Sequence, residues 1–417
     1  MKLLIVADDL TGTLDTGIKF ADRGIRVRVL NTTEDRKDWF RDETEVVVIN
    51  TNTRHLPQKD AYRIVFETVK RGRELGCDNV YKKTDSGLRG RIGAEITAVA
   101  SAMETGVVFA PALPSAHRIT VGGIHYCDGV PVSESAFGRD PIDPVEYSEV
   151  REILLTTGGH GMSVSLGSGT SYRSPGIGEV LICDASSDED LHRIAEHAAD
   201  SLDGQIPVLC GCAGFAEALA EVLPFMKTDH LEKAHKPKIL FLSGSMHPMT
   251  KAQIRYAKEQ GVFCQTVTAA ALLREKAFLD GNGDGGGFDS VLRAVEADGY
   301  GIYAVDPDND AETLPVAAQA GIAKEDIPLR LTEVLADKAK YAAKHIRNLC
   351  LFITGGDTLE AVLRTLHADE IIPLTELSPG IVELELVLKD GEQLSAISKA
   401  GGLGSIDAVA EILKGVR

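Results

Sequence analysis

The chain has 417 residues, of which 44% are hydrophobic and 25% are charged, and it carries 44 Lys and Arg against 62 Asp and Glu. Such a composition is typical of a folded protein of two or three domains, long enough to build hydrophobic cores without disulfide or metal cross-links. A formal net charge of -18 would repel nucleic acids and anionic membranes, so we expect neither as a partner; a small anionic ligand responds only to the local charge of its site.

The cysteines and the N-terminal residues indicate the compartment. Seven cysteines are scattered along the chain, most of them in apolar runs, which favours buried and reduced thiols. Cys210 and Cys212 form one Cys-x-Cys pair without a second pair, so we expect no zinc site. The short apolar run at the N-terminus ends in Asp8 and Asp9 and does not resemble a signal peptide, and no run approaches about 20 apolar residues. We therefore expect a cytoplasmic protein without a membrane span.

Apolar runs of strand length alternate with segments of helical periodicity in the first half of the chain. Strands are expected at KLLIVADD (2–9), RVRVL (26–30), EVVVIN (45–50), NVYKKTD (79–85) and GVVFAPA (106–112), with helices at 59–75 and 93–103. These strands are rich in Val, Ile and Leu without alternation in polarity, which indicates burial on both faces of a mainly parallel sheet.

The pattern loosens between residues 121 and 178, which are rich in Gly, Pro and Ser and predict long loops and short hairpins. The alternation of strands and helices then resumes, with a strand at EVLICDA (179–185), a helix from Glu189 and the segment PVLCGCAGFAEALAEVL (207–223).

A polar segment, MKTDHLEKAHKPK, begins at Met226 and predicts a linker over residues 229–237. Strands follow at 239–245, 262–268, 301–307 and 348–356, with helices around 249–260, 290–297, 331–346 and 358–366. The Gly-rich run from Gly281 is expected to be a loop, and Asp390-Gly391 predicts a hairpin. We therefore predict an α/β fold with two domains, residues 1–228 and 238–417, each a mainly parallel sheet flanked by helices. An active-site cleft is expected between them.

Charged side chains follow three predicted strands of the first domain. Asp8 and Asp9 follow the first strand, Arg54 follows the third, and KKTDSGLRGR begins at Lys82. Ligands of open α/β sheets bind at the carboxyl ends of the strands, so these groups should meet there. Arg54 and a lysine can hold a carboxylate, and Asp9 and Asp85 can accept hydrogen bonds from hydroxyls, which favours a small hydroxy acid. The alternatives are a solvated charged face and a helix cap formed by one of the aspartates.

Three Gly-rich turns follow predicted strands of the second domain, in LFLSGSMHPMT, LFITGGDTLEAVL and ISKAGGLGS. Gly355 and Gly356 would let backbone N–H groups approach an anion at the start of the next helix. Any one of these turns could be a simple tight connection, but three in one domain favour a nucleotide phosphate site. The sequence has no GxxxxGK[ST] motif and no GxGxxG after the first strand, which argues against a P-loop protein and against a dinucleotide-dependent dehydrogenase.

The motifs ADDLTGTLDTG, KKTDSGLRG, GGIHYCDGVPVSES, SGSMHPMT, TGGDTLEAVL and SKAGGLGS, in this order, resemble the four-carbon acid sugar kinase family over nearly the whole chain. The resemblance implies phosphorylation of threonate, erythronate or 3-oxo-tetronate with ATP, the N-terminal domain binding the sugar acid and the C-terminal domain ATP. The chain departs from the family at Gly87, where Thr is more usual, at Met246-His247, and at Cys210 or Cys212.

The resemblance also implies the residues of the two binding sites. The implied substrate-binding residues are Asp9, Arg54, Lys82, Lys83, Thr84 and Asp85. The implied nucleotide-binding residues are Ser243, Gly355, Gly356, Asp357, Thr358 and Gly401.

A kinase of this kind is expected to use Mg²⁺, which would bridge the ATP phosphates; the sequence leaves its protein ligands unknown. We expect Asp357 to be the general base, because this acid opens a helix beside a Gly-Gly turn, with Asp9 and Asp85 as alternatives. A non-catalytic sugar-acid-binding protein and a hydroxy-acid dehydrogenase are the alternative functions. The sequence leaves the oligomeric state open and allows a homodimer.

Overall fold

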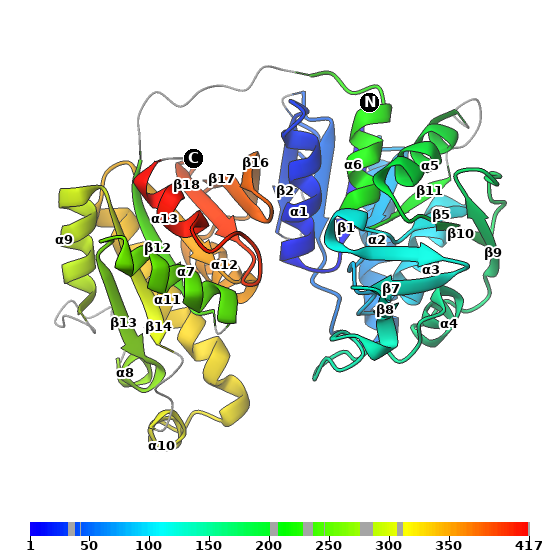
Figure 1. Ribbon diagram of the computed structural model, residues 1–417. Coiled ribbons are helices and arrows are strands. Elements are labelled where there is room, and N and C mark those ends of the chain that lie inside the picture. The colour runs from blue at the N-terminus through cyan, green and yellow to red at the C-terminus, as the bar shows by residue number, and fades with distance from the viewer. Residues whose placement is uncertain are drawn as a thin grey trace. The chain divides into compact units, whose positions relative to one another are not determined.

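The computed structural model describes residues 1–31, 38–41, 43–200, 207–227, 237–245, 247–275, 287–306 and 312–415. The chain divides into two compact units, residues 1–229 and 230–417 (Figure 1). Each unit is a mainly parallel sheet flanked by helices, which confirms the predicted α/β class. The predicted linker up to residue 236 and the Gly-rich run 281–286 lie outside the described residues.

The sheet of the first unit has the strand order β2-β3-β1-β4-β11-β5-β10-β9, and its neighbouring strands are parallel. The strands are β1 (Leu3–Ala7), β2 (Val27–Leu30), β3 (Val46–Asn50), β4 (Asn79–Lys83), β5 (Val107–Ala110), β9 (Ser163–Ser168), β10 (Glu179–Asp184) and β11 (Val208–Gly211). The helices are α1 (Leu10–Ala21), α2 (Gln58–Glu74), α3 (Ile92–Met103), α4 (Val150–Thr156), α5 (Asp188–Asp200) and α6 (Ala213–Val222). Every residue of β1, β2 and β3 is buried, as their continuous apolar sequences predict.

Strand register brings the charged strand ends together. Ala7, the last residue of β1, pairs with Asn50 of β3 on one side and with Lys83 of β4 on the other. Gly211 of β11 also pairs with Lys83. The residues after Ala7 and Asn50 therefore leave the sheet at the same edge as Lys83.

The stretch 121–178 is only partly as predicted. The strands β6 (Arg118–Val121), β7 (Ile124–Cys127) and β8 (Val130–Pro131) form a small antiparallel sheet, and the short 3₁₀ helices are η1 (Pro114–Ala116) and η2 (Val132–Glu134). The stretch also contains α4 and β9, which we did not predict. α4 is too short to display helical periodicity, and β9 has the sequence SVSLGS, whose serines weaken the strand signal.

The sheet of the second unit has the order β13-β14-β12-β15-β18-β17-β16, parallel up to β18 and antiparallel beyond it. The strands are β12 (Lys238–Ser243), β13 (Cys264–Thr268), β14 (Tyr300–Asp306), β15 (Leu349–Thr354), β16 (Glu370–Ser378), β17 (Ile381–Val387) and β18 (Gln393–Lys399). The helical segments are α7 (Pro248–Glu259), α8 (Ala269–Arg274), α9 (Phe288–Asp298), α10 (Thr313–Gln319), η6 (Lys324–Asp326), α11 (Ile327–His345), α12 (Gly356–Leu366) and α13 (Ala408–Lys414).

The end of the chain confirms the predicted hairpin, because β17 and β18 pair around Asp390-Gly391. β16 was not predicted, since Pro373 within it is a residue that usually argues against a strand, and the register shifts between Pro373 and Thr375.

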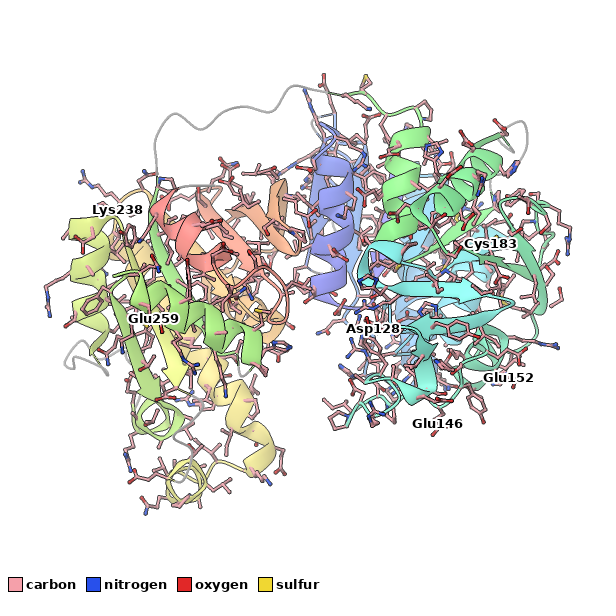
Figure 2. The ribbon with its side chains drawn as sticks, in the orientation of Figure 1. Asp128, Glu146, Glu152, Cys183, Lys238 and Glu259 are labelled. Atoms are coloured by element: carbon pink, nitrogen blue, oxygen red, sulfur yellow. The ribbon has the colours of Figure 1, made fainter. Side chains whose placement is uncertain are left out.

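Two further expectations concern cysteines and membranes. All seven cysteines are free thiols, and Cys183 lies buried on β10 (Figure 2). No helix in the described ranges combines the length and the apolar character that crossing a membrane requires.

We predict that Gly93→Ala destabilises the first unit. A Cβ at this position of α3 would lie 1.9 Å from the Leu154 carbonyl oxygen and 2.5 Å from the Gly159 nitrogen, so the backbone itself would have to move. Overpacking of this kind costs about 1–3 kcal/mol, measurable as a lower free energy of unfolding in urea. Gly176→Ala is the control, because a Cβ there meets nothing within 4 Å; equal stability of the two variants would contradict the packing described for α3.

Candidate functional site

The ionic centre of the first unit is the guanidinium of Arg54. Its Nε and Nη2 donate to the two oxygens of Asp8 at 2.7 and 3.1 Å. Its Nη1 lies 2.7 Å from Asp9 Oδ2, and its Nη2 lies 3.7 Å from Asp85 Oδ1. One buried cation therefore joins carboxylates that follow β1 and β4. Arg54 and Asp85 are brought together as predicted, and Asp8 is the partner that the sequence reasoning left out of the site.

The two aspartates after β1 have different electrostatic states. Burial would raise the pKa of Asp8, but Arg54, Lys82 and Lys83 more than offset it and lower that pKa. Burial and the neighbouring Asp8 carboxylate raise the pKa of Asp9 above its usual value. Asp9 also caps α1, because its Oδ1 accepts a hydrogen bond from the Gly12 N–H at 2.8 Å. Helix capping, which we considered as the alternative role of one aspartate, is thus present alongside the Arg54 contact.

Lys82 and Lys83 are neighbours on β4, and their side chains have different partners. Lys82 Nζ lies 3.0 Å from Glu95 Oε2 in a pair whose side chains are almost wholly buried. Glu95 and Asp8 raise the pKa of Lys82 against the opposing effect of burial. Lys83 Nζ donates to the Thr84 carbonyl at 2.8 Å and forms no ion pair with a carboxylate in the described part of the chain. Lys82 is therefore in direct contact with a carboxylate, whereas Lys83 acts on the nearby Asp8, Asp9 and Asp85 carboxylates only from a greater distance.

Lys83 also lies beside the start of α1. A Cβ on Gly12 would be 2.6 Å from Asp9 Oδ1 and 2.9 Å from Lys83 Nζ, so only a glycine leaves both groups room there. Thr84 Oγ1 is buried and has no hydrogen-bond partner in the described structure.

Asp85 is held by arginines on both sides of its turn. Burial would raise the pKa of Asp85, but Arg54 and Arg89 hold it well below its usual range. Arg89 Nε and Nη2 donate to Asp85 at 2.9 and 3.1 Å, and its Nη1 donates to Asp140 at 2.9 Å. A carboxylate so stabilised in its charged form is a poor proton acceptor.

The turn after β4 is covered by the ring of Phe137. The guanidinium of Arg89 lies 5.2 Å and that of Arg118 lies 5.0 Å from the ring centroid, both within cation–π range. Arg118 also donates to Ser86 Oγ. A Cβ on Gly87 would be 2.3 Å from the Phe137 ring, so the ring occupies the space that a side chain at position 87 would need. A larger residue at position 87, such as the threonine that the family resemblance leads one to expect, would require the ring to shift.

The candidate nucleotide site of the second unit lies at the carboxyl ends of β12, β15 and β18. Ser243 pairs with Thr354, and Thr354 pairs with Lys399, so these three strand ends are level. Gly355 has a φ of 100°, which favours glycine, and no side chain caps the helix α12 that follows it. Thr354 Oγ1 is buried without a hydrogen-bond partner among the described residues. The uncapped N–H groups of α12 can bind an anion.

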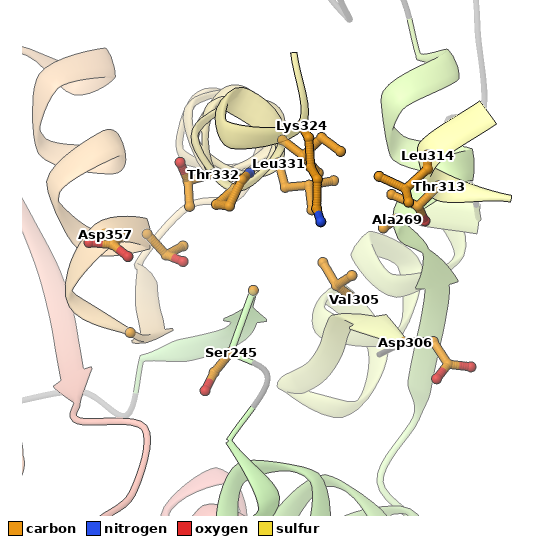
Figure 3. A pocket seen from close by; sticks show the side chains of 15 residues that line it. Ser245, Ala269, Val305, Asp306, Thr313, Leu314, Lys324, Leu331, Thr332 and Asp357 are labelled. Carbon is orange, nitrogen blue, oxygen red and sulfur yellow. The ribbon is translucent and has the colours of Figure 1, made fainter. Parts of the chain in front are cut away.

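A cavity of about 480 Å³ opens beside this helix start (Figure 3). Its apolar walls come from α8, β14, α10 and α11, and Figure 3 shows Val305 and Leu314 across the cavity from Asp357. Gly244, Gly355, Asp357 and Thr358 complete its lining. The volume and the mixture of apolar walls with a few polar groups are typical of small-ligand sites.

The predicted nucleotide residues are close together but not all in the cavity. Gly355, Asp357 and Thr358 line it, whereas Ser243, Gly356 and Gly401 do not. The carbonyl of Gly401 accepts a hydrogen bond from Thr250 Oγ1 of α7 at 2.7 Å.

Several residues of the two sites were missed in the sequence. Glu95 could have been identified from the sequence, because it is the one charged residue in the helix IGAEITAVASAM, whose other residues are apolar or small. Arg89 stands within a motif that we quoted. Arg118 and Phe137 had no comparable signal, because Arg118 lies just before the turn-rich stretch 121–178 and Phe137 lies within it, where the path of the chain depends on tertiary contacts.

Two family models match different parts of the chain. The family model described as a sugar-binding N-terminal domain matches residues 3–219, and the one described as a nucleotide-binding C-terminal domain matches residues 240–409. The chain is 28% identical to a D-threonate kinase of Salmonella typhimurium, over 99% of this chain and 98% of the relative. It is 27% identical to a D-erythronate kinase of Heliobacterium modesticaldum (98% and 95%) and 23% identical to a 3-oxo-tetronate kinase of Brucella melitensis (97% and 93%).

Solved structures show the same fold. A Salmonella typhimurium protein matches with a TM-score of 0.79 at 20% identity, and a Haemophilus influenzae protein matches with a TM-score of 0.73 at 19% identity. Each match covers 99% of both chains. With both family models matched in order along its length, the chain belongs to the four-carbon acid sugar kinase family.

Proposed function

We propose that the protein transfers the terminal phosphoryl group of ATP to a hydroxyl of a four-carbon sugar acid, which is D-threonate, D-erythronate or a related tetronate. The observation that carries the proposal is the pairing, in one chain, of a charged strand-end site with a cavity bordered by an uncapped helix start. The relatives named for tetronate substrates, which match nearly the whole chain, support the choice of acceptor. The expected cleft between the units, the cytoplasmic location and the homodimer stay predictions.

The cations of the first unit differ in whether a carboxylate of the protein already contacts them, and this difference indicates which of them would bind the sugar acid. Arg54 is already shared by three carboxylates and Lys82 is paired with Glu95, so Lys83 is the cation of the predicted set whose charge a ligand carboxylate can balance. Asp9 and the Thr84 hydroxyl offer hydrogen bonds to hydroxyl groups. Arg54 would then act mainly by fixing the positions of the aspartates.

The second unit fits ATP by the chemistry of its lining. The apolar walls of the cavity suit a purine ring, and the first N–H groups of α12 suit phosphate oxygens. ATP would supply the phosphoryl group, and Mg²⁺ would offset the phosphate charge. In the described ranges no group of three or more His, Cys, Asp or Glu side chains is placed to hold a metal. We therefore expect Mg²⁺ to be held mainly by phosphate oxygens and water, with one or two carboxylates.

The transfer needs a group that accepts the proton of the attacking hydroxyl. We propose Asp357, which lines the cavity in the first turn of α12 and is exposed to solvent. Asp9 is the alternative, because its raised pKa makes it a better proton acceptor than its neighbours. Asp85 is disfavoured by its contacts with Arg54 and Arg89.

The direct test is ADP release with Mg·ATP and each of D-threonate, D-erythronate and 3-oxo-tetronate. We expect ADP to form with at least one acid and phosphate to appear on that acid. Binding of a sugar acid without any use of ATP would instead support a binding protein, and turnover that requires a nicotinamide cofactor would support a dehydrogenase.

We predict that Lys83→Met and Lys82→Met separate binding from stability. Loss of a charge-assisted bond from Lys83 is worth about 1.5–3 kcal/mol, which is roughly a ten- to hundred-fold rise in KM for the sugar acid. Lys82→Met leaves Glu95 buried and unpaired, which typically costs about 3–5 kcal/mol of folding stability. Steady-state kinetics of both variants give the KM for the sugar acid, and urea unfolding gives their folding stability. An unchanged KM in Lys83→Met would refute its assignment to the substrate carboxylate.

Gly356→Val should weaken ATP binding at least tenfold while sugar-acid binding stays near the parent value. The added side chain would stand at the first residue of α12, where backbone N–H groups must approach the phosphates. Calorimetric titrations with ATP and with the sugar acid give both affinities, and the second serves as the internal control. If ATP binds as tightly as before, the nucleotide lies elsewhere.

Asp357→Asn should lower kcat by about 10²- to 10⁴-fold with little change in the sugar-acid KM, because loss of a general base has that effect. Asp9→Asn is the matched comparison and should have the smaller effect on kcat. The reverse order of the two kcat values would move the base to Asp9.

A further inference from the structure

Among the residues that the structure describes, three lysines have fully buried side chains: Lys82, Lys338 and Lys399. Lys82 is paired with Glu95 at 3.0 Å, and Lys338 with Glu275 at 2.8 Å. Lys399, at the end of β18, forms no ion pair with a carboxylate in the part of the chain that the structure describes. Burying an unpaired charge is expensive, so a fold that retains one has a use for it or an anion that balances it.

The ammonium of Lys399 is bound by neutral oxygens alone. Its Nζ donates to the Ala400 and Gly401 carbonyls at 3.0 and 3.1 Å and to Thr250 Oγ1 at 3.4 Å. Thr250 lies in the first turn of α7, where the helix dipole adds further positive potential. Burial lowers the pKa of Lys399 to about 8, and no carboxylate opposes this effect.

These bonds determine the direction of two backbone N–H groups. The C=O of Ala400 and the N–H of Gly401 belong to one trans peptide plane and point in opposite directions, as do the C=O of Gly401 and the N–H of Gly402. Because both carbonyls point to Lys399, both N–H groups point away from it. In the described structure neither N–H has an acceptor. Backbone N–H groups that lack an acceptor within the protein are available to bind an anion.

The turn lies against the first Gly-rich turn of the unit. A Cβ on Gly401 would be 2.9 Å from Ser245 Oγ, and one on Gly402 would be 3.1 Å from His247 Nε2. Ser245 also lines the cavity beside α12. The two N–H groups therefore belong to the same strand-end region as the proposed nucleotide site.

We propose that Lys399 is a positioning residue for phosphate: it holds the Gly401 and Gly402 N–H groups toward the phosphate chain of the nucleotide and supplies the positive charge behind them. The inference rests on the proposed function, because it assumes that a nucleotide occupies the cavity. It adds Lys399 and Gly402 to the residues that the family motifs imply.

Lys399→Met tests the proposal through the ratio of two affinities. Adenosine lacks phosphates, so its Kd should stay within twofold, whereas the Kd of ATP should rise at least tenfold, both measured by calorimetry on the full chain. The thermal stability of the ligand-free variant should be unchanged or higher, because a buried charge without a carboxylate partner has been removed. A structural role alone would lower stability and leave the affinity ratio unchanged.

Lys338→Met is the matched control, since this lysine is equally buried but paired. It should lose stability and keep the ratio of ATP to adenosine affinity. If Lys399→Met does not fold, Lys399→Gln, which retains donors for the carbonyls without the charge, is measured instead and should also weaken ATP selectively. An unchanged ratio in the folded Lys399 variant overturns this inference alone, while failure of the parent protein to bind ATP overturns it together with the proposed nucleotide function.

Discussion

The first unit depends on the charge balance around Arg54. A single guanidinium contacts Asp8, Asp9 and Asp85, which follow the adjacent parallel strands β1 and β4. Without that cation, three carboxylates crowded at one sheet edge would repel one another and take up protons. With it, the strand ends are held in fixed positions. Arg54, Lys82 and Arg89 are therefore paired with carboxylates of the protein itself. In the proposed function, a ligand would be recognised by groups outside these pairs.

The second unit handles charge in a different way. Its cavity is mainly apolar, and the groups suited to an anion are backbone N–H groups of Gly-rich turns, supported by the buried Lys399. A site of this kind offers positive potential without side chains that must rearrange when a highly charged ligand arrives. With the proposed function, the two units would separate two tasks, which are selective contact with a small polar acceptor and neutralisation of a polyphosphate.

Much of this arrangement could be predicted from the sequence, for identifiable reasons. Continuous Val, Ile and Leu runs indicated the buried parallel strands, and parallel register implied that Asp9, Arg54 and Lys83 meet. Elements that depend on neighbours were missed, such as β9 with its serines and β16 with its proline. The different environments of Lys82 and Lys83 follow from the alternation of side chains along a strand, but the partner Glu95 could be identified only once α3 was placed over the sheet.

The contact between Gly87 and the Phe137 ring limits the order in which this site can change by mutation. A side chain at position 87 would collide with the Phe137 ring in its present position, and the guanidinium groups of Arg89 and Arg118 stack on that ring. A larger residue at position 87 therefore requires the Phe137 ring to move or to be replaced by a smaller side chain, and either change would remove the stacking partner of both arginines. We therefore expect the effects of mutations at positions 87 and 137 to depend on each other, so that exchanging one of the two segments alone would disturb this packing.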